Sequence, residues 1–185
     1  AEDNVWGRSI SACSSSSDPS CYENFGPYTP GFKIIPYDDA ETLENVLIDN
    51  KNIVAFMIEP IQGEAGIIIP KENYLTKVSE ICKKYNVLFI ADEIQSGLGR
   101  SGKMLACDYE KVRPDILCLG KALSGGVYPV SAVLSDNHIM NCITPGTHGS
   151  TYGGNPIASV VAKTSLKVLL EEDLINNSYN IGKYF

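Results

Sequence analysis

The chain has 185 residues, 44% of them apolar and 20% charged, a composition that excludes an intrinsically disordered protein and suits one ordinary globular domain. Its formal net charge is −7 and its basic residues are scattered, which argues against binding to nucleic acid or to an anionic membrane. No apolar run approaches the roughly 20 residues that a membrane-spanning helix needs, so we expect a soluble protein.

Short apolar runs alternate with helical patterns along the chain, which predicts an α/β fold of three layers, a mostly parallel sheet between helices. The runs are nearly continuously apolar, so we expect strands that are buried on both faces. The predicted strands cover residues 32–36, 53–58, 87–91, 115–119 and 130–134.

Three helices are predicted from capping residues and helical periodicity. The first begins at Asp38 or Asp39, where Asp38 and Glu41 can form a capping box. The second covers residues 74–85, an amphipathic crossover between two strands. The third follows Asn155 as its cap, with proline at the first helical position. The intervening polar segments have the composition of loops within a single domain; they cover residues 11–31, 92–114 and 141–154.

The six cysteines show neither a CxxC motif nor a Cys/His metal spacing, so we expect free thiols in a reducing compartment and no metal site. The sequence begins at Ala1 without an initiator methionine, and we expect the native amino terminus to be missing. An intracellular protein is therefore expected; the cytoplasm is favoured and the mitochondrial matrix stays open. The cysteines are Cys13, Cys21, Cys82, Cys107, Cys118 and Cys142.

Two acidic residues, Asp92 and Glu93, follow the predicted strand 87–91 directly. Carboxylates at the end of a buried strand are costly unless something charged lies beside them, so a cationic partner is implied. The alternative is that these acids only cap the loop or helix that follows.

A single lysine, Lys121, follows the predicted strand 115–119 and precedes a glycine-rich turn. Desolvation at the edge of a sheet favours a neutral amine, the form that makes a Schiff base. Taken alone, a lysine such as Lys121 is more often a surface residue whose ammonium reaches water. Ligands of open α/β sheets bind beyond the carboxyl ends of the strands. A lysine and a carboxylate at that edge together suit pyridoxal phosphate, because the acid keeps the ring nitrogen protonated.

Four segments carry a strong resemblance to the class III, fold type I aminotransferases. They are AFMIEPIQGEAG at 55–66, LFIADEIQSG at 88–97, LGKALSGG at 119–126 and HGSTYGGNP at 148–156. Within that family, WGR at 6–8 and YPVSAV at 128–133 are most similar to the ornithine aminotransferases. The resemblance implies that residues 1–185 form most of the large domain that binds pyridoxal 5′-phosphate. It also implies that the phosphate-binding loop and the small carboxy-terminal domain lie outside this chain.

The resemblance implies roles for five residues around the cofactor. Lys121 would form the Schiff base and move the proton at the substrate carbon, while Asp92 would partner the ring nitrogen. Gln95 would donate to the ring hydroxyl, unless it is a loop glutamine facing water. Ser150 and Thr151 would donate to the cofactor phosphate of a neighbouring subunit, which implies a homodimer; otherwise they form a turn.

Two further residues are implied in substrate binding. Arg8 would bind the substrate α-carboxylate, for which a planar guanidinium is suited, although by itself it is one more surface arginine. Glu64 resembles the family's switch residue, which pairs with an arginine beyond this chain. Glu59 is expected to be a structural acid. The resemblance departs at Val5, where the ornithine aminotransferases usually have an aromatic residue.

The implied reaction transfers the δ-amino group of ornithine to 2-oxoglutarate, giving glutamate 5-semialdehyde and glutamate. Aminotransferases that act on acetylornithine or 4-aminobutyrate remain alternatives, because Lys121, Asp92 and Gln95 would be common to all of them. A rival of another class is a non-catalytic module that keeps the fold; its mark would be loss of the lysine or of the acid, and both are present.

Overall fold

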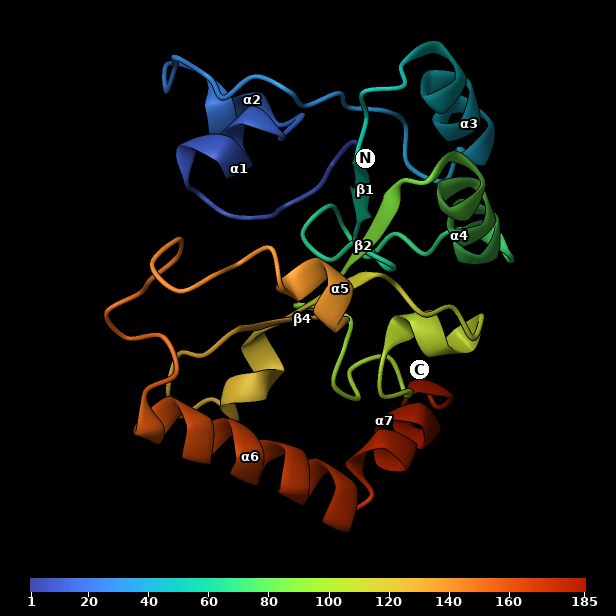
Figure 1. Cartoon of the computed structure of the whole chain (residues 1–185). Helices are drawn as coiled ribbons and strands as arrows, with labels where there is room; N and C mark the ends of the chain where they lie inside the picture. The colour runs from blue at the N-terminus through green and yellow to red at the C-terminus, as the bar shows by residue number, and fades with distance from the viewer.

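The computed structural model describes all residues, 1–185, and has a four-stranded sheet at its centre (Figure 1). The strands are β1 (Ala55–Ile58), β2 (Leu88–Asp92), β3 (Ile116–Leu119) and β4 (Ala132–Ser135), which lie side by side in that order. β1 pairs with β2 and β2 with β3 in parallel, whereas β4 runs antiparallel to β3. The predicted α/β fold with a mostly parallel sheet is confirmed.

The prediction of a strand at residues 32–36 is wrong, because this segment pairs with no strand of the sheet. Its one described backbone partner is Glu2, whose N–H donates to the carbonyl of Ile35 at 2.8 Å. Ile35 is buried in the core, and Pro36 has no N–H to offer to a strand ladder. The apolar run therefore anchors an extended segment through one buried side chain instead of forming a strand.

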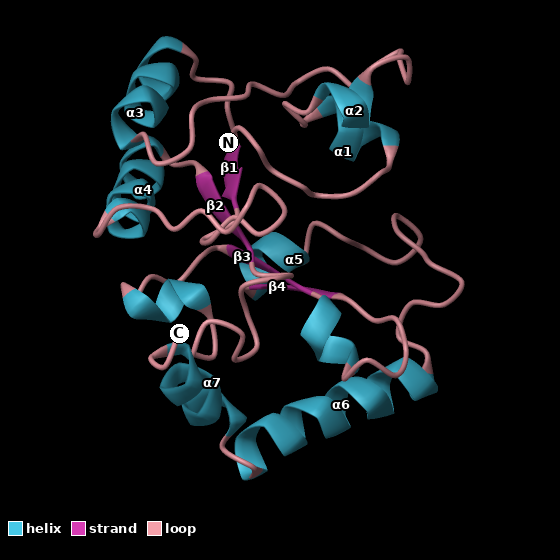
Figure 2. Cartoon of the chain, turned by 180° about the vertical axis from the view of Figure 1, so that it is seen from behind, coloured by secondary structure: helices cyan, strands magenta, loops and turns pink.

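The remaining elements are helices, which surround the sheet (Figure 2). The α-helices are α1 (Ile10–Ser14), α2 (Pro19–Tyr22), α3 (Ala40–Asp49), α4 (Tyr74–Tyr85), α5 (Asn137–Met140), α6 (Pro156–Glu171) and α7 (Leu174–Gly182), and the 3₁₀ helices are η1 (Ala106–Tyr109) and η2 (Lys121–Ser124). The predicted helix at 74–85 is confirmed, but α1 and α2 lie in a segment predicted to be a loop.

The helix predicted to begin at Asp38 or Asp39 is α3, and its cap is Asp39, whose carboxylate accepts from the N–H of Thr42 at 2.9 Å. The predicted capping box between Asp38 and Glu41 is wrong. Asp38 has a positive φ of 59° and accepts instead from the N–H of Lys71 at 3.1 Å, so it links two loops and does not cap the helix.

One face of the sheet is covered by α3 and α4, which stand together beside β1 and β2 in both views (Figures 1 and 2). Leu43 and Leu47 of α3 and Val78 of α4 are buried in one cluster with Phe56 of β1 and Phe89 of β2. This main core fixes the two strands whose carboxyl ends carry the candidate site.

The other end of the molecule is closed by α6, which begins after Asn155 as predicted. The Asn155 side chain accepts from the N–H of Ala158 at 2.9 Å. Leu166 and Leu169 of α6 pack on the small cluster that contains Leu119 and Leu123. A further helix, α7, was not predicted; it follows Asp173, whose φ of 53° breaks the helical path. None of the helices is long and apolar enough to span a membrane.

The expectation that every strand is buried on both faces is wrong for β4. Val133 is 56% exposed and Leu134 is 47% exposed. Successive side chains of a strand point to opposite faces, so neither face of β4 is fully covered within this chain.

Candidate functional site

Asp92 and Lys121 lie at the same edge of the sheet. Asp92 is the last residue of β2 and is in register with Cys118 of β3, and Lys121 begins η2 two residues after β3 ends. Because β2 and β3 are parallel, their carboxyl ends meet at one edge. Lys121 itself has a φ of 39°, so the chain turns sharply where its side chain emerges.

The Asp92 carboxyl is 4% exposed. Its Oδ1 accepts from the N–H of Ile94 at 3.0 Å, and its Oδ2 makes no hydrogen bond within the chain. Burial raises the pKa of Asp92 to about 6, with help from the negative charges of Glu59 and Glu93 and against the opposing effect of Lys121. A cationic donor at the free oxygen would therefore stabilise the ionised form.

Glu93 has a different environment, although it is the next residue. It is almost fully buried, and its carboxylate accepts from the Ser96 hydroxyl at 2.5 Å and from the N–H of Cys107 at 2.8 Å. The hydrogen bonds of the Glu93 carboxylate thus come from neutral donors, so the prediction of a cationic partner is wrong for Glu93. It holds the loop after β2 against η1, which is a structural role.

Lys121, Glu64 and Gln95 meet beside this edge. The Lys121 Nζ lies 3.6 Å from Oε1 of Glu64, and the Gln95 side-chain amide donates to the same oxygen at 3.0 Å. The Lys121 side chain is 51% exposed, so the expected desolvation of the lysine is not met in this chain. An ion pair so open to water contributes little stability; its importance is that it brings three predicted site residues together.

The position of Gln95 depends on a glycine that the sequence analysis did not single out. A Cβ added at Gly63 would overlap Oε1 of Gln95, so no other residue type fits there without moving the amide. The available signal was the glycine directly before Glu64 in a segment that follows a strand.

Gly63→Ala is therefore expected to displace Gln95 and to break its hydrogen bond to Glu64. From the sequence, Gln95 is expected to donate to the ring hydroxyl of pyridoxal phosphate. We therefore expect the affinity for this cofactor to fall about tenfold, the effect of losing that one hydrogen bond to a charged group. Cofactor titration of the full-length protein, followed by its visible absorption, measures this. Gly182→Ala is the control, because a Cβ there meets nothing within 4 Å and its φ is not in the left-handed region; equal affinities in the two variants would contradict the prediction.

Glu59 joins the two segments that carry the predicted substrate residues. Its Oε1 accepts from the N–H of Val5 at 3.0 Å and its Oε2 from the N–H of Gly63 at 3.1 Å. Val5 stands three residues before Arg8, and Gly63 stands directly before Glu64. The buried carboxylate thus ties both segments to the end of β1, in agreement with the structural role expected for it.

Arg8 is exposed and donates from Nη1 to the sulfur of Cys21 at 3.1 Å. No hydrogen bond or ion pair joins it to Lys121, Asp92 or Glu64. The structure brings its segment to the site through Glu59, whereas its guanidinium contacts α2.

Ser150 and Thr151 are exposed in the irregular segment 141–154. The Ser150 hydroxyl accepts from the N–H of Gly153 at 3.1 Å, which is the turn expected as the alternative role. Within the chain, neither residue is bonded to Lys121, Asp92 or Gln95.

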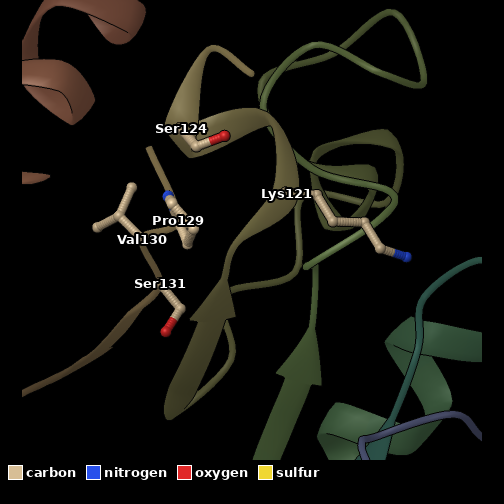
Figure 3. A pocket seen from close by; sticks show the side chains of 5 residues that line it. All are labelled: Lys121, Ser124, Pro129, Val130 and Ser131. Carbon is tan, nitrogen blue, oxygen red and sulfur yellow. The ribbon is translucent and has the colours of Figure 1, made fainter. Parts of the chain in front are cut away.

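A cavity of about 410 Å³ borders η2, but the lysine amine is not directed into it. The cavity is lined by Lys121, Ser124, Pro129, Val130 and Ser131. Figure 3 shows the Lys121 side chain pointing away from the other four, and its Nζ is the atom that approaches Glu64. The Lys121 amine therefore faces Glu64 and not this cavity.

The six cysteines are free, as predicted, and nowhere do three or more His, Cys, Asp or Glu side chains gather in a way that could hold a metal ion.

The fold and the sheet-edge site define an aminotransferase domain: a family model described as aminotransferase class-III matches residues 2–185, and the chain belongs to that family. Its relatives narrow the comparison to the ornithine type. The mitochondrial ornithine aminotransferase of Drosophila melanogaster is 60% identical over 182 residues, covering 98% of this chain and 42% of that protein.

Two solved structures are also similar, one an ornithine aminotransferase and the other an acetylornithine aminotransferase. An ornithine aminotransferase from Toxoplasma gondii, with partial occupancy of PLP at its active site, has a TM-score of 0.97 and 52% identity, covering 99% of this chain and 43% of that one. An acetylornithine aminotransferase from Elizabethkingia anophelis has a TM-score of 0.82 and 57% identity, covering 84% of this chain and 41% of that one. The chain spans less than half the length of the relatives it matches.

Proposed function

We propose that this chain supplies the central part of a pyridoxal 5′-phosphate site, with Lys121 binding the cofactor covalently and Asp92 accepting from its ring nitrogen. The observation that carries the proposal is the buried Asp92 carboxyl, whose Oδ2 lacks a donor at the edge where Lys121 emerges. A protonated ring nitrogen is a cationic donor of the kind this oxygen needs, so the residues present fit the cofactor.

When bound, the cofactor supplies an electron sink for the charge left on the substrate carbon. Lys121 would hold the cofactor and, as a free amine, would remove the proton from the substrate carbon and return it. Asp92 would accept, as a carboxylate, from the ring nitrogen. Gln95 donates from its amide to the ring hydroxyl, at the position that Gly63 leaves open for it.

Substrate binding is assigned to Arg8 and Glu64. Arg8 pairs with the α-carboxylate of the amino acid substrate. Glu64 accepts from Gln95 and lies close to Lys121 in this chain, and we propose that in the whole enzyme it alternates with an arginine from a small domain outside residues 1–185. The phosphate-binding loop is likewise assigned to a segment outside the chain.

Ser150 and Thr151 are assigned to the phosphate of a second copy, which makes the active enzyme a homodimer with its site between subunits. Their exposure and their lack of bonds to Lys121 and Asp92 within one chain support this assignment.

The proposed reaction is ornithine δ-aminotransfer to 2-oxoglutarate, which yields glutamate 5-semialdehyde and glutamate. The similarity to the Drosophila and Toxoplasma proteins supports it. The second candidate is acetylornithine aminotransfer, favoured by the 57% identity to the Elizabethkingia structure. A non-catalytic module is disfavoured because the lysine and the buried acid are both present at the same edge of the sheet. An intracellular compartment, cytoplasm or mitochondrial matrix, is supported by the free thiols and by the mitochondrial relative.

The test uses the full-length protein carrying this sequence, loaded with cofactor and without any oxo acid. Ornithine, N-acetylornithine and 4-aminobutyrate are added separately while the visible absorption band is recorded. Loss of the band with ornithine alone is expected. Loss with N-acetylornithine instead would move the substrate to the second candidate, and a protein with no visible band would overturn the assignment of Lys121.

A further inference from the structure

Cys21 lies between the Arg8 guanidinium and the Asp18 carboxylate. Nη1 of Arg8 donates to the Cys21 sulfur at 3.1 Å, and the Cys21 thiol donates to Oδ2 of Asp18 at 3.3 Å. The thiol is 7% exposed, whereas Arg8 and Asp18 reach the surface on either side of it. The three side chains thus form a chain of two hydrogen bonds that links the negative charge of Asp18 to the positive charge of Arg8, called the relay below.

The direction of these hydrogen bonds matters for their strength. The thiol has one proton, which goes to Asp18, and this leaves the sulfur as the acceptor for Arg8. Bonds in such a chain polarise one another, so the charge of Asp18 makes the sulfur a better acceptor. Hydrogen bonds from Ser20 and then from Cys21 lower the pKa of Asp18, which keeps it ionised.

The relay uses one edge of the Arg8 guanidinium. Nη1 is the Arg8 atom that makes a hydrogen bond within the chain, and a guanidinium has five N–H donors. The remaining donors are available for a carboxylate, which is bound best by two parallel hydrogen bonds. A long, mobile arginine gains affinity when its orientation is fixed before the ligand arrives.

We propose that Cys21 and Asp18 are positioning residues for Arg8, which hold its guanidinium ready for the α-carboxylate of the amino acid substrate. This inference rests on the substrate role of Arg8 in the proposed function. Asp18 has a second task as the cap of α2, where it accepts from the N–H of Ser20 at 2.9 Å. The variants must therefore separate orientation of Arg8 from stability of α2.

The experiment measures kcat and KM for ornithine in the full-length holoenzyme, for Cys21→Ala, Cys21→Ser and Asp18→Asn. Cys21→Ala removes the relay and is expected to raise KM about three- to tenfold with kcat unchanged, the effect of one lost hydrogen bond. Cys21→Ser keeps a donor and an acceptor and is expected to restore KM. Asp18→Asn keeps the cap but removes the charge, and is expected to raise KM about two- to threefold by weakening one bond of the relay.

Two controls make the outcomes distinct. Cys13→Ala removes a buried thiol of neighbouring α1 whose sulfur makes no hydrogen bond, and is expected to leave KM unchanged. Arg8→Gln is expected to raise KM more than any relay variant. If Arg8→Gln raises KM but Cys21→Ala and Asp18→Asn do not, the positioning role is overturned and the proposed function stands. If Arg8→Gln itself has no effect, the substrate role of Arg8 fails, and the inference fails with it. A fall in kcat that Cys21→Ser does not reverse would show a structural role and overturn the proposal.

Discussion

Replacing Lys121 with alanine is expected to lower the rate of transamination at least about 10³-fold, because one side chain provides both the covalent attachment and the base. Neither neighbour can replace it, because neither the Glu64 carboxylate nor the Gln95 amide can form a Schiff base with the cofactor. The loss should be in kcat, and added cofactor should not restore it. Steady-state kinetics on the full-length protein measure the effect. Borohydride reduction of the wild-type holoenzyme, followed by peptide mass spectrometry, should place the cofactor on Lys121.

Two variants show whether the effect is chemical. Lys121→Arg keeps the positive charge beside Glu64 but has no amine that can bond to the cofactor, and is expected to be as inactive as Lys121→Ala. Lys167→Ala removes another exposed lysine that pairs with a glutamate, at 3.7 Å, and is expected to leave the rate unchanged. An active Lys121→Ala protein would disprove the proposed site.

Asp92→Asn is expected to lower kcat/KM by about 10²- to 10³-fold, because an amide cannot hold the proton on the cofactor ring as a carboxylate does. The same substitution should have the opposite effect on the stability of the cofactor-free protein. The folded pKa of Asp92 is about 6 and its ordinary value is 3.8. A raised acid pKa favours the folded state at low pH, and this contribution is lost as the pH rises from about 4 through 6.

A pKa of about 6 in place of 3.8 corresponds to about 3 kcal/mol between pH 4 and pH 8. Thermal unfolding of the cofactor-free protein at pH 8 should therefore show Asp92→Asn as more stable than the wild type, and the difference should shrink towards pH 4. In the holoenzyme the order should reverse, since the cofactor offsets the cost of the buried charge. Asp115→Asn, at the opposite end of β3, is the control and should leave kcat/KM within about tenfold. A holoenzyme in which Asp92→Asn keeps full activity would remove Asp92 from the cofactor site.

The prediction of the sheet from sequence succeeded where burial was dense. The apolar runs of β1, β2 and β3 lie beside the α3–α4 core, so their composition reflects the fold directly. It failed at residues 32–36, where the same apolar composition occurs in an extended segment that buries one side chain, Ile35, and forms no strand. It also missed α1 and α2, because their Ser- and Pro-rich sequences resemble those of loops and the helices are four or five residues long.

Among the site residues, the sequence distinguished poorly between neighbours of the same chemistry. Asp92 and Glu93 are adjacent acids after one strand, and the pattern implied a cation for both. Only the structure separates them, since Glu93 is satisfied by Ser96 and Cys107 while Asp92 keeps an oxygen without a donor. Likewise, a lone lysine after a strand does not reveal that Glu64 and Gln95 approach it from two separate loops.

The sequence by itself determined the α/β class, the positions of the four strands along the chain and the placing of Asp92 and Lys121 at strand ends, because these follow from local composition. The order of the strands in the sheet came from the structure. The tertiary structure decided which groups meet: Glu59 between the Val5 and Gly63 backbones, and Cys21 between Arg8 and Asp18. Those contacts join residues separated by loops, and their hydrogen bonds depend on distance and burial, which residue spacing does not encode.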